Sequence, residues 1–136
     1  FLMKSIAQNT DYVENQTLLQ EVEEKYKIQI REDIKEFIKL NSGGYPLKDV
    51  IEAEDDEYEV RVFLSVNKEN TEYYLEKPLK YFLEKTKGKI IPIAIDSGDN
   101  YYCVNNETGN VYFWSAGEDL YYKISESVKK FTEMFR

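Results

Sequence analysis

Apolar residues recur every three or four positions in two segments near the start of the chain, 17–26 and 31–40. This spacing is typical of amphipathic helices that bury one face. Thr17 stands at the N-cap position of the first segment, with a glutamine three residues later in a capping-box pattern. The second helix is expected to end at Gly43 or Gly44, because glycine readily takes the left-handed conformation that terminates helices. Residues 1–15 lack such periodicity, and we expect a loosely ordered lead-in.

The middle of the chain alternates between strand and helix patterns. The predicted order is a strand, an exposed acidic loop, a strand, a helix and a buried strand, over residues 47–51, 52–59, 58–66, 71–89 and 89–95. Pro78 falls in the first turn of the helix, where proline is tolerated. Pro92 has no N–H to donate, so the last strand is expected at a sheet edge or with a bulge.

Aromatic-rich strands follow at 101–104 and 111–114, joined by a loop in which Gly109 is expected to supply a positive φ. A short strand is expected at 120–122, and Ser125 is expected to cap a final helix. This order predicts an α+β fold in one domain, residues 1–136. Its mostly antiparallel twisted sheet would be flanked by the N-terminal helices, one inserted helix and the C-terminal helix.

The residue types that the chain lacks exclude several classes of enzyme and of metal site. It contains no histidine and a single cysteine, which excludes Ser-His-Asp and Cys-His nucleophiles, histidine metal sites and an internal disulfide. We therefore expect no enzyme, no metal and no cofactor. The formal net charge of −8 disfavours direct nucleic-acid binding and favours a basic protein partner. With no apolar run long enough for a membrane span, the expected location is the cytoplasm and the expected state a monomer or weak homodimer.

The stretch "DSGDNYYCVNNE" resembles a calcium-binding loop, but Tyr101 stands where such a loop needs glycine. Asp96 and Asp99 could form an acid–base pair, although Asp and Asn at a bend more often bond their own backbone. Cys103 lies among apolar strand residues and is expected to be a buried structural thiol. Three acidic segments remain, namely 52–59, the Asp96/Asp99 turn and 118–119. They form either a solvated surface or a patch for a cationic partner, depending on whether they converge in space.

The chain resembles the SUKH superfamily, the Smi/Knr-type domains, over about residues 18–135. The resemblance rests on the helix before "NSGGYP", on "IPIAIDSGDNYYCVNN", on "GNVYFW" and on the closing "ISESVKKFTEMF". It implies an α+β fold without enzymatic activity. Bacterial members are commonly immunity proteins that block a toxin, and fungal members act in cell-wall regulation. The positions that match the family motifs look structural: Gly43, Gly44, Pro92, Gly98, Gly109 and Trp114.

These observations lead to the hypothesis of an immunity protein that neutralises a cognate toxin, with a basic nuclease as the class that an acidic partner suits. The expected partner contacts are Tyr45, Asp55, Asp56, Glu57, Asp96, Asp99, Tyr101, Glu118 and Asp119. The alternative is a non-enzymatic adaptor or regulator of cell-wall or envelope synthesis. A hydrolase that uses only carboxylates is a third, less supported hypothesis, because the chain offers no imidazole base.

Overall fold

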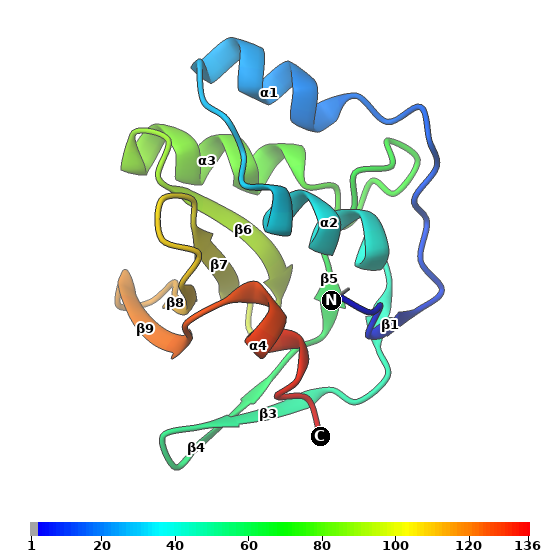
Figure 1. Ribbon diagram of the computed structural model, residues 1–136. Helices are drawn as coiled ribbons and strands as arrows, with labels where there is room; N and C mark the ends of the chain where they lie inside the picture. Colours follow the sequence, from blue (N-terminus) through cyan, green and yellow to red (C-terminus); the bar gives the residue numbers. More distant parts are fainter. Residues whose placement is uncertain (1–2) are drawn as a thin grey trace.

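Figure 1 shows the computed structural model of the protein, which describes residues 3–136. The helices are α1 (Leu18–Tyr26), α2 (Glu32–Asn41), α3 (Glu76–Thr86) and α4 (Val128–Thr132). The strands are β1 (Ala7–Gln8), β2 (Tyr45–Pro46), β3 (Val50–Ala53), β4 (Asp56–Glu59), β5 (Val62–Phe63), β6 (Ile90–Ile95), β7 (Tyr101–Asn105), β8 (Val111–Ser115) and β9 (Leu120–Ser125).

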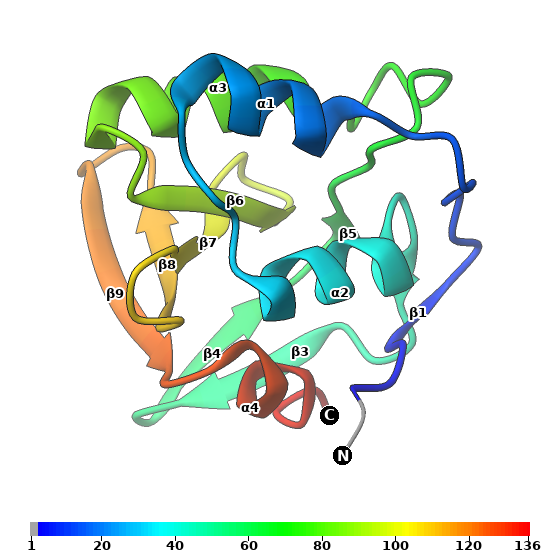
Figure 2. The same cartoon turned by 45° about the horizontal axis from the view of Figure 1, so that its top comes forward.

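The central element is an antiparallel five-stranded sheet in the order β5-β6-β7-β8-β9. Helix α3, with α1 beside it, covers one face of this sheet, and α2 and α4 cover the other (Figures 1 and 2). Alternation along each strand decides which side chain meets which helix. Tyr102 and Val104 belong to the main core, whereas Cys103 and Trp114 pack in a second cluster with Phe82 of α3. The predicted α+β fold is confirmed.

Aromatic rings connect the sheet to the helices on both faces. On the α2/α4 face, the ring of Phe131 lies 6.1 Å from Phe37 and 5.9 Å from Tyr102. On the α3 face, Phe82 meets Trp114 edge-on at 5.0 Å. Burying a large apolar side chain contributes about 1.5–3 kcal/mol, so these contacts hold the layers together. The buried Tyr102 hydroxyl donates to the carbonyl oxygen of Glu59 at 2.7 Å, which leaves no unpaired donor in the main core at this point.

The segment before α1 is held against the body of the protein. β1 pairs with β2, and the backbone N–H of Ile6 donates to Oδ1 of Asn41 at 2.9 Å. Met3 is buried. The expectation of a loosely ordered lead-in is therefore not met over residues 3–15, while residues 1 and 2 lie outside the described part of the chain. These contacts are made with residues more than 30 positions away, and no local pattern could indicate them.

Asp11 fixes the second half of this segment. Its carboxylate accepts hydrogen bonds from the hydroxyls of Ser42 (2.8 Å) and Ser65 (2.6 Å) and from the amide of Asn70 (3.1 Å). Gly43, with a φ of +69°, ends α2 as predicted, and a Cβ there would collide with the Asp11 carboxylate. The residues that follow α2 thus form the surface against which the lead-in packs.

The acidic segment 52–59 was expected to be an exposed loop. Its side chains at 52 and 54–57 are exposed, but the expectation of a loop is wrong. It forms most of a hairpin in which β3 pairs with β4. Glu54 and Asp55 occupy the turn with φ values of 52° and 69°, the left-handed backbone that a two-residue hairpin turn requires. Ile51 is fully buried, and the Tyr58 ring packs 5.2 Å from Phe113 of β8. These two apolar contacts hold strands whose charged composition favoured a loop.

Three further element predictions need correction. The strand expected over 58–66 is interrupted, and only β5 joins the central sheet. The helix expected over 71–89 spans Glu76–Thr86, because residues 73–75 bond the backbone of Ser65 instead. Pro92 lies in an inner strand with a register shift between Pro92 and Ala94, so the predicted bulge is confirmed and the edge position is not.

The capping predictions are partly wrong as well. Thr17 occupies the N-cap position of α1, but its hydroxyl donates to the carboxylate of Glu21 and bonds no backbone N–H. Ser127, not Ser125, caps α4 by accepting from the N–H of Lys130 at 3.0 Å. Ser125 is instead the last residue of β9, which extends three residues beyond the strand predicted there. Gly109 has a φ of +83°, which confirms the predicted hairpin loop.

Candidate partner-binding face

Two of the three acidic segments lie together at one end of the central sheet. The turns β6–β7 and β8–β9 are alternate turns of the antiparallel meander, separated by the β7–β8 loop at the other end, so they lie at the same end of the sheet. Oδ1 of Asn100 in the first turn accepts a hydrogen bond from the N–H of Ala116 in the second at 2.9 Å. This bond ties the two turns to each other.

Asp96 builds the first of these turns. Its Oδ1 accepts from the N–H groups of Gly98 (2.9 Å) and Asn100 (2.8 Å), which is an Asx turn. Oδ2 accepts from the side chain of Asn100 at 3.1 Å, so both carboxylate oxygens are engaged. The left-handed residue is Asp99, with a φ of 64°, rather than Gly98.

Across residues 3–136 no group of three acidic or cysteine side chains is placed to hold a metal ion.

The second turn also binds its own carboxylates. Asp119 accepts from Lys85 of α3 and from the indole N–H of Trp114 at 2.8 Å, and these hydrogen bonds, that of Lys85 first, lower the pKa of Asp119. Glu118 accepts from the hydroxyl of Tyr122 at 2.8 Å, which raises the pKa of that tyrosine. Both carboxylates are exposed, yet each stabilises the turn.

The third acidic segment meets this end of the sheet through its base. At the end of β4, the carboxylate of Glu59 accepts from the N–H and the hydroxyl of Ser97 at 2.9 and 2.8 Å. Asp55, Asp56 and Glu57 lie toward the tip of the hairpin, about 10 Å further along the strand. They are exposed, and their carboxylates make no hydrogen bond or ion pair with any residue in 3–136. The acidic segments therefore converge only in part.

The two tyrosines among the expected contacts differ in position. Tyr45 is 45% exposed in β2, which pairs with β1 near the β5 edge of the sheet. Asp119 lies by β9 at the opposite edge, about 19 Å away across four strand spacings, so the two residues do not share one patch. Tyr101 is half-buried, with its ring 5.8 Å from Phe82. Burial, and then the charge of Asp99, raises the pKa of Tyr101.

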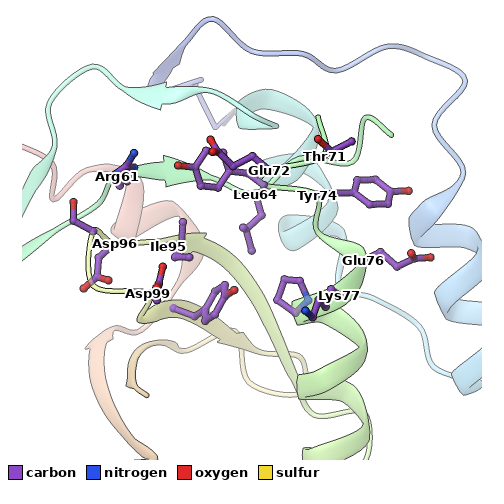
Figure 3. A pocket seen from close by; sticks show the side chains of 14 residues that line it. Arg61, Leu64, Thr71, Glu72, Tyr74, Glu76, Lys77, Ile95, Asp96 and Asp99 are labelled. Carbon is purple, nitrogen blue, oxygen red and sulfur yellow. The ribbon is translucent and has the colours of Figure 1, made fainter. Parts of the chain in front are cut away.

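An open cleft that the sequence did not predict adjoins the Asp96 turn (Figure 3). It has a volume of about 540 Å³ and lies between β5, the loop before α3, the first turn of α3 and the β6–β7 turn. Asp96, Asp99 and Tyr101 of the expected contacts line it. The lining residues that were missed include Arg61, Glu72, Tyr73, Tyr74 and Lys77. The polar, tyrosine-rich run before α3 was the available signal, but it was interpreted as part of the helix.

The residues that match the family motifs have identifiable packing environments. A Cβ on Gly44 would lie 2.7 Å from the side chain of Ala7, and one on Gly109 would lie 2.9 Å from the guanidinium of Arg31.

Cys103 is fully buried, and this burial raises the pKa of its thiol well above the ordinary value. A thiol in that state is a weak nucleophile.

The model of the SMI1 / KNR4 family (SUKH-1) matches residues 15–134, and the chain therefore belongs to this family. The match runs from just before α1 to just beyond α4 and includes both acidic turns and the cleft. No curated protein matches the chain. None of the helices within residues 3–136 has the length and apolar character that crossing a membrane requires.

Proposed function

We propose that this chain is an immunity protein. It binds a cognate protein toxin of a polymorphic or contact-dependent toxin system in the cytoplasm and neutralises it by stoichiometric binding, without catalysis. Family membership is consistent with this function. The net charge of −8 and the grouping of acidic turns at one end of the sheet suit a basic partner. A toxin that cleaves nucleic acid is the favoured class, because its active site must attract phosphates and carboxylates can take their place.

The main support for this proposal is that the acidic residues of the β3–β4 hairpin destabilise the hairpin itself. Glu52 and Glu57 lie directly opposite each other, a like-charge pair that costs about 0.2–1 kcal/mol relative to a neutral one. Within residues 3–136, the charge of Glu52 is offset only by a 3.8 Å contact with Arg136. The turn places Glu54 and Asp55 in left-handed backbone where glycine or asparagine is preferred. Sequences break local rules of this kind mainly where function requires it.

The expected contacts divide into two groups by what their carboxylates already do. The carboxylates of Asp55, Asp56, Glu57 and Asp99 accept no hydrogen bond and form no ion pair within residues 3–136, and we propose them as the charges that meet the toxin. The remaining proposed contacts shape the surface or add apolar area, and they are Tyr45, Asp96, Tyr101, Glu118 and Asp119. Free carboxylates contribute more to association because no internal partner has to be given up.

The first test is affinity capture of the tagged protein from lysate of its source organism at low and high salt, read by mass spectrometry. The proposal expects one dominant basic partner that elutes at high salt. That partner should arrest growth when it is expressed alone and lose this effect when the chain is co-expressed. Recovery of several wall-synthesis or signalling proteins instead, with no toxic partner, would favour the adaptor alternative and contradict the proposal.

Charge variants then test the hairpin. Asp55→Asn, Asp56→Lys and Glu57→Lys together reverse the tip, and asparagine keeps the left-handed turn accessible. Toxin affinity should fall at least tenfold, and its salt dependence should flatten. The matched control is Glu14→Lys with Glu24→Lys, two exposed carboxylates far from the hairpin that have no hydrogen bond or ion pair in residues 3–136. Equal affinity of the two variants would exclude the hairpin as a contact surface.

A further inference from the structure

We propose that the cleft beside the Asp96 turn is a pocket for an arginine side chain presented by the protein partner. This inference rests on the proposed function, since the partner is the toxin. One anchoring residue of the toxin is then an arginine, and the residues that line the cleft receive its side chain. Nothing in the family match assigns this cleft a role.

The shape of the cleft fits a side chain with its flanking backbone. Its volume of about 540 Å³ lies within the range of small-molecule and side-chain pockets. Leu64 and Ile95 are 3% and 7% exposed and form an apolar floor, and Pro78 adds to one wall. Figure 3 shows Asp96 and Asp99 on one side of this floor and Glu76 and Lys77 on the other. An aliphatic stem could lie on the floor while its charged end stays at the polar wall.

The charges of the cleft favour a cation. Four carboxylates line it, against two cationic groups, and one of the carboxylates, Glu76, is already paired with Lys80 of α3 at 3.4 Å. One of those cations, Arg61, is engaged by the hydroxyl of Tyr73 and by the charge of Glu72, which raise its pKa. The Asp99 carboxylate is exposed and makes no hydrogen bond or ion pair within residues 3–136, so it remains available to an incoming donor. A guanidinium can give two parallel hydrogen bonds to one such carboxylate.

Aromatic surfaces favour arginine over lysine. The rings of Tyr74 and Tyr101 both line the cleft. Tyr101 is held in place by ring contacts with Phe82 (5.8 Å) and Trp114 (6.2 Å), so little side-chain entropy is lost when a ligand packs on it. A planar guanidinium can stack on such a face and bond a carboxylate at its edge, whereas an ammonium group is compact and strongly hydrated.

The test is an NMR titration of the ¹⁵N-labelled full chain with capped tripeptides, acetyl-Gly-Xaa-Gly-amide, in which Xaa is Arg, Lys, Leu or Glu. The arginine peptide should produce saturable shifts with a millimolar dissociation constant at the amides of Glu72, Lys77, Asp99 and Tyr101. The lysine peptide should bind more weakly, and the leucine and glutamate peptides should not saturate. Preferential binding of the glutamate peptide would identify an anion site at Arg61 and Lys77 and overturn the proposal.

Asp99→Asn is the diagnostic variant, because asparagine tolerates the left-handed φ of 64° and removes only the charge. It should weaken the arginine peptide by about threefold to tenfold, the range expected for an exposed charge pair with added stacking. Glu107→Gln is the control, an exposed carboxylate outside the cleft, and should leave affinity unchanged. Unchanged affinity in Asp99→Asn would refute the pocket.

The two proposals fail in different ways. Tight toxin binding with no response to the arginine peptide leaves the immunity function standing and refutes the pocket. Saturable arginine binding without any toxic partner supports the pocket and removes the immunity function. Substituting each arginine of a captured toxin by lysine completes the test, since one substitution should weaken the complex with the unmodified chain and have little effect with Asp99→Asn.

Discussion

Replacing Asp11 should destabilise the protein more than its position in an irregular, partly exposed segment indicates. The Asp11 carboxylate is the acceptor for the hydroxyls of Ser42 and Ser65, and both serines are fully buried. Each hydrogen bond to a charged group contributes about 1.5–3 kcal/mol, and a buried donor that loses its partner costs about 1–3 kcal/mol. The exposed side of Asp11 allows water to replace part of this. We therefore expect Asp11→Ala to lower the free energy of unfolding by about 3 kcal/mol.

The assay is urea denaturation followed by far-UV circular dichroism and by the fluorescence of the single tryptophan, Trp114. The midpoint should fall while the slope stays constant, because the change removes hydrogen bonds without altering the surface exposed on unfolding. Asp11→Asn should lose about half as much, since its amide oxygen can still accept from one hydroxyl. Glu14→Ala, three residues further along the same segment, serves as the control and should change stability by less than about 0.5 kcal/mol. A loss below about 1 kcal/mol in Asp11→Ala would refute this account of how the lead-in is held.

Three further predictions concern the sheet. Gly109→Ala places a Cβ at a φ of +83° and should cost about 1–2 kcal/mol in thermal or chemical unfolding, whereas Gly117→Ala, which meets nothing within 4 Å, should be neutral. The hydroxyl of Tyr121 is buried with no hydrogen-bond partner in residues 3–136, so Tyr121→Phe should leave stability unchanged or raise it by up to about 1 kcal/mol. Tyr102→Phe should lower stability by up to about 1 kcal/mol, because the Tyr102 hydroxyl donates a hydrogen bond to Glu59. A Tyr102→Phe variant more stable than Tyr121→Phe would contradict this account of the two hydroxyls. The pKa of Asp119 is lowered in the folded state, so its stabilising contribution is present above the unfolded value of about 4 and is lost as the pH falls through the folded pKa. Asp119→Asn should therefore be less stable than the wild type at pH 7, and the difference measured by urea unfolding should shrink as the pH falls through the folded pKa of Asp119. A difference that stays constant as the pH falls would exclude this linkage.

Local periodicity correctly predicted the elements whose buried face follows from the spacing of their own apolar residues. Helix α2 and the hairpin of β7 and β8 occur where their apolar spacing placed them, and Gly109 has the backbone conformation that its loop position demanded. A side chain on such an element faces the core because of its own spacing, and neighbouring residues suffice to express it. The same reasoning identified the Asp96 turn, since an aspartate that bonds N–H groups two and four residues later is a local structure.

Elements held by distant partners were predicted poorly. The acidic composition of residues 52–59 indicated a loop, but the contact of Tyr58 with Phe113, 55 positions later, stabilises a hairpin. Helix α3 starts later than predicted because residues 73–75 pair with Ser65. In both cases a tertiary contact outweighs a local preference of only a few tenths of a kcal/mol per residue.

The sequence alone determined that the protein is an acidic α+β domain without histidine chemistry, because composition and periodicity are properties of the chain. Only the tertiary structure decided which of its carboxylates are free. Asp119 and Asp99 are both aspartates in hairpin turns. The fold brings Lys85 of α3 and the indole N–H of Trp114 to the carboxylate of Asp119, and it brings no donor from residues 3–136 to the carboxylate of Asp99. The cleft likewise exists only because a loop before α3 comes to lie beside a turn 20 or more residues away. A hydrogen bond or a cavity depends on positions in space, and residues far apart in sequence acquire these positions only when the chain folds.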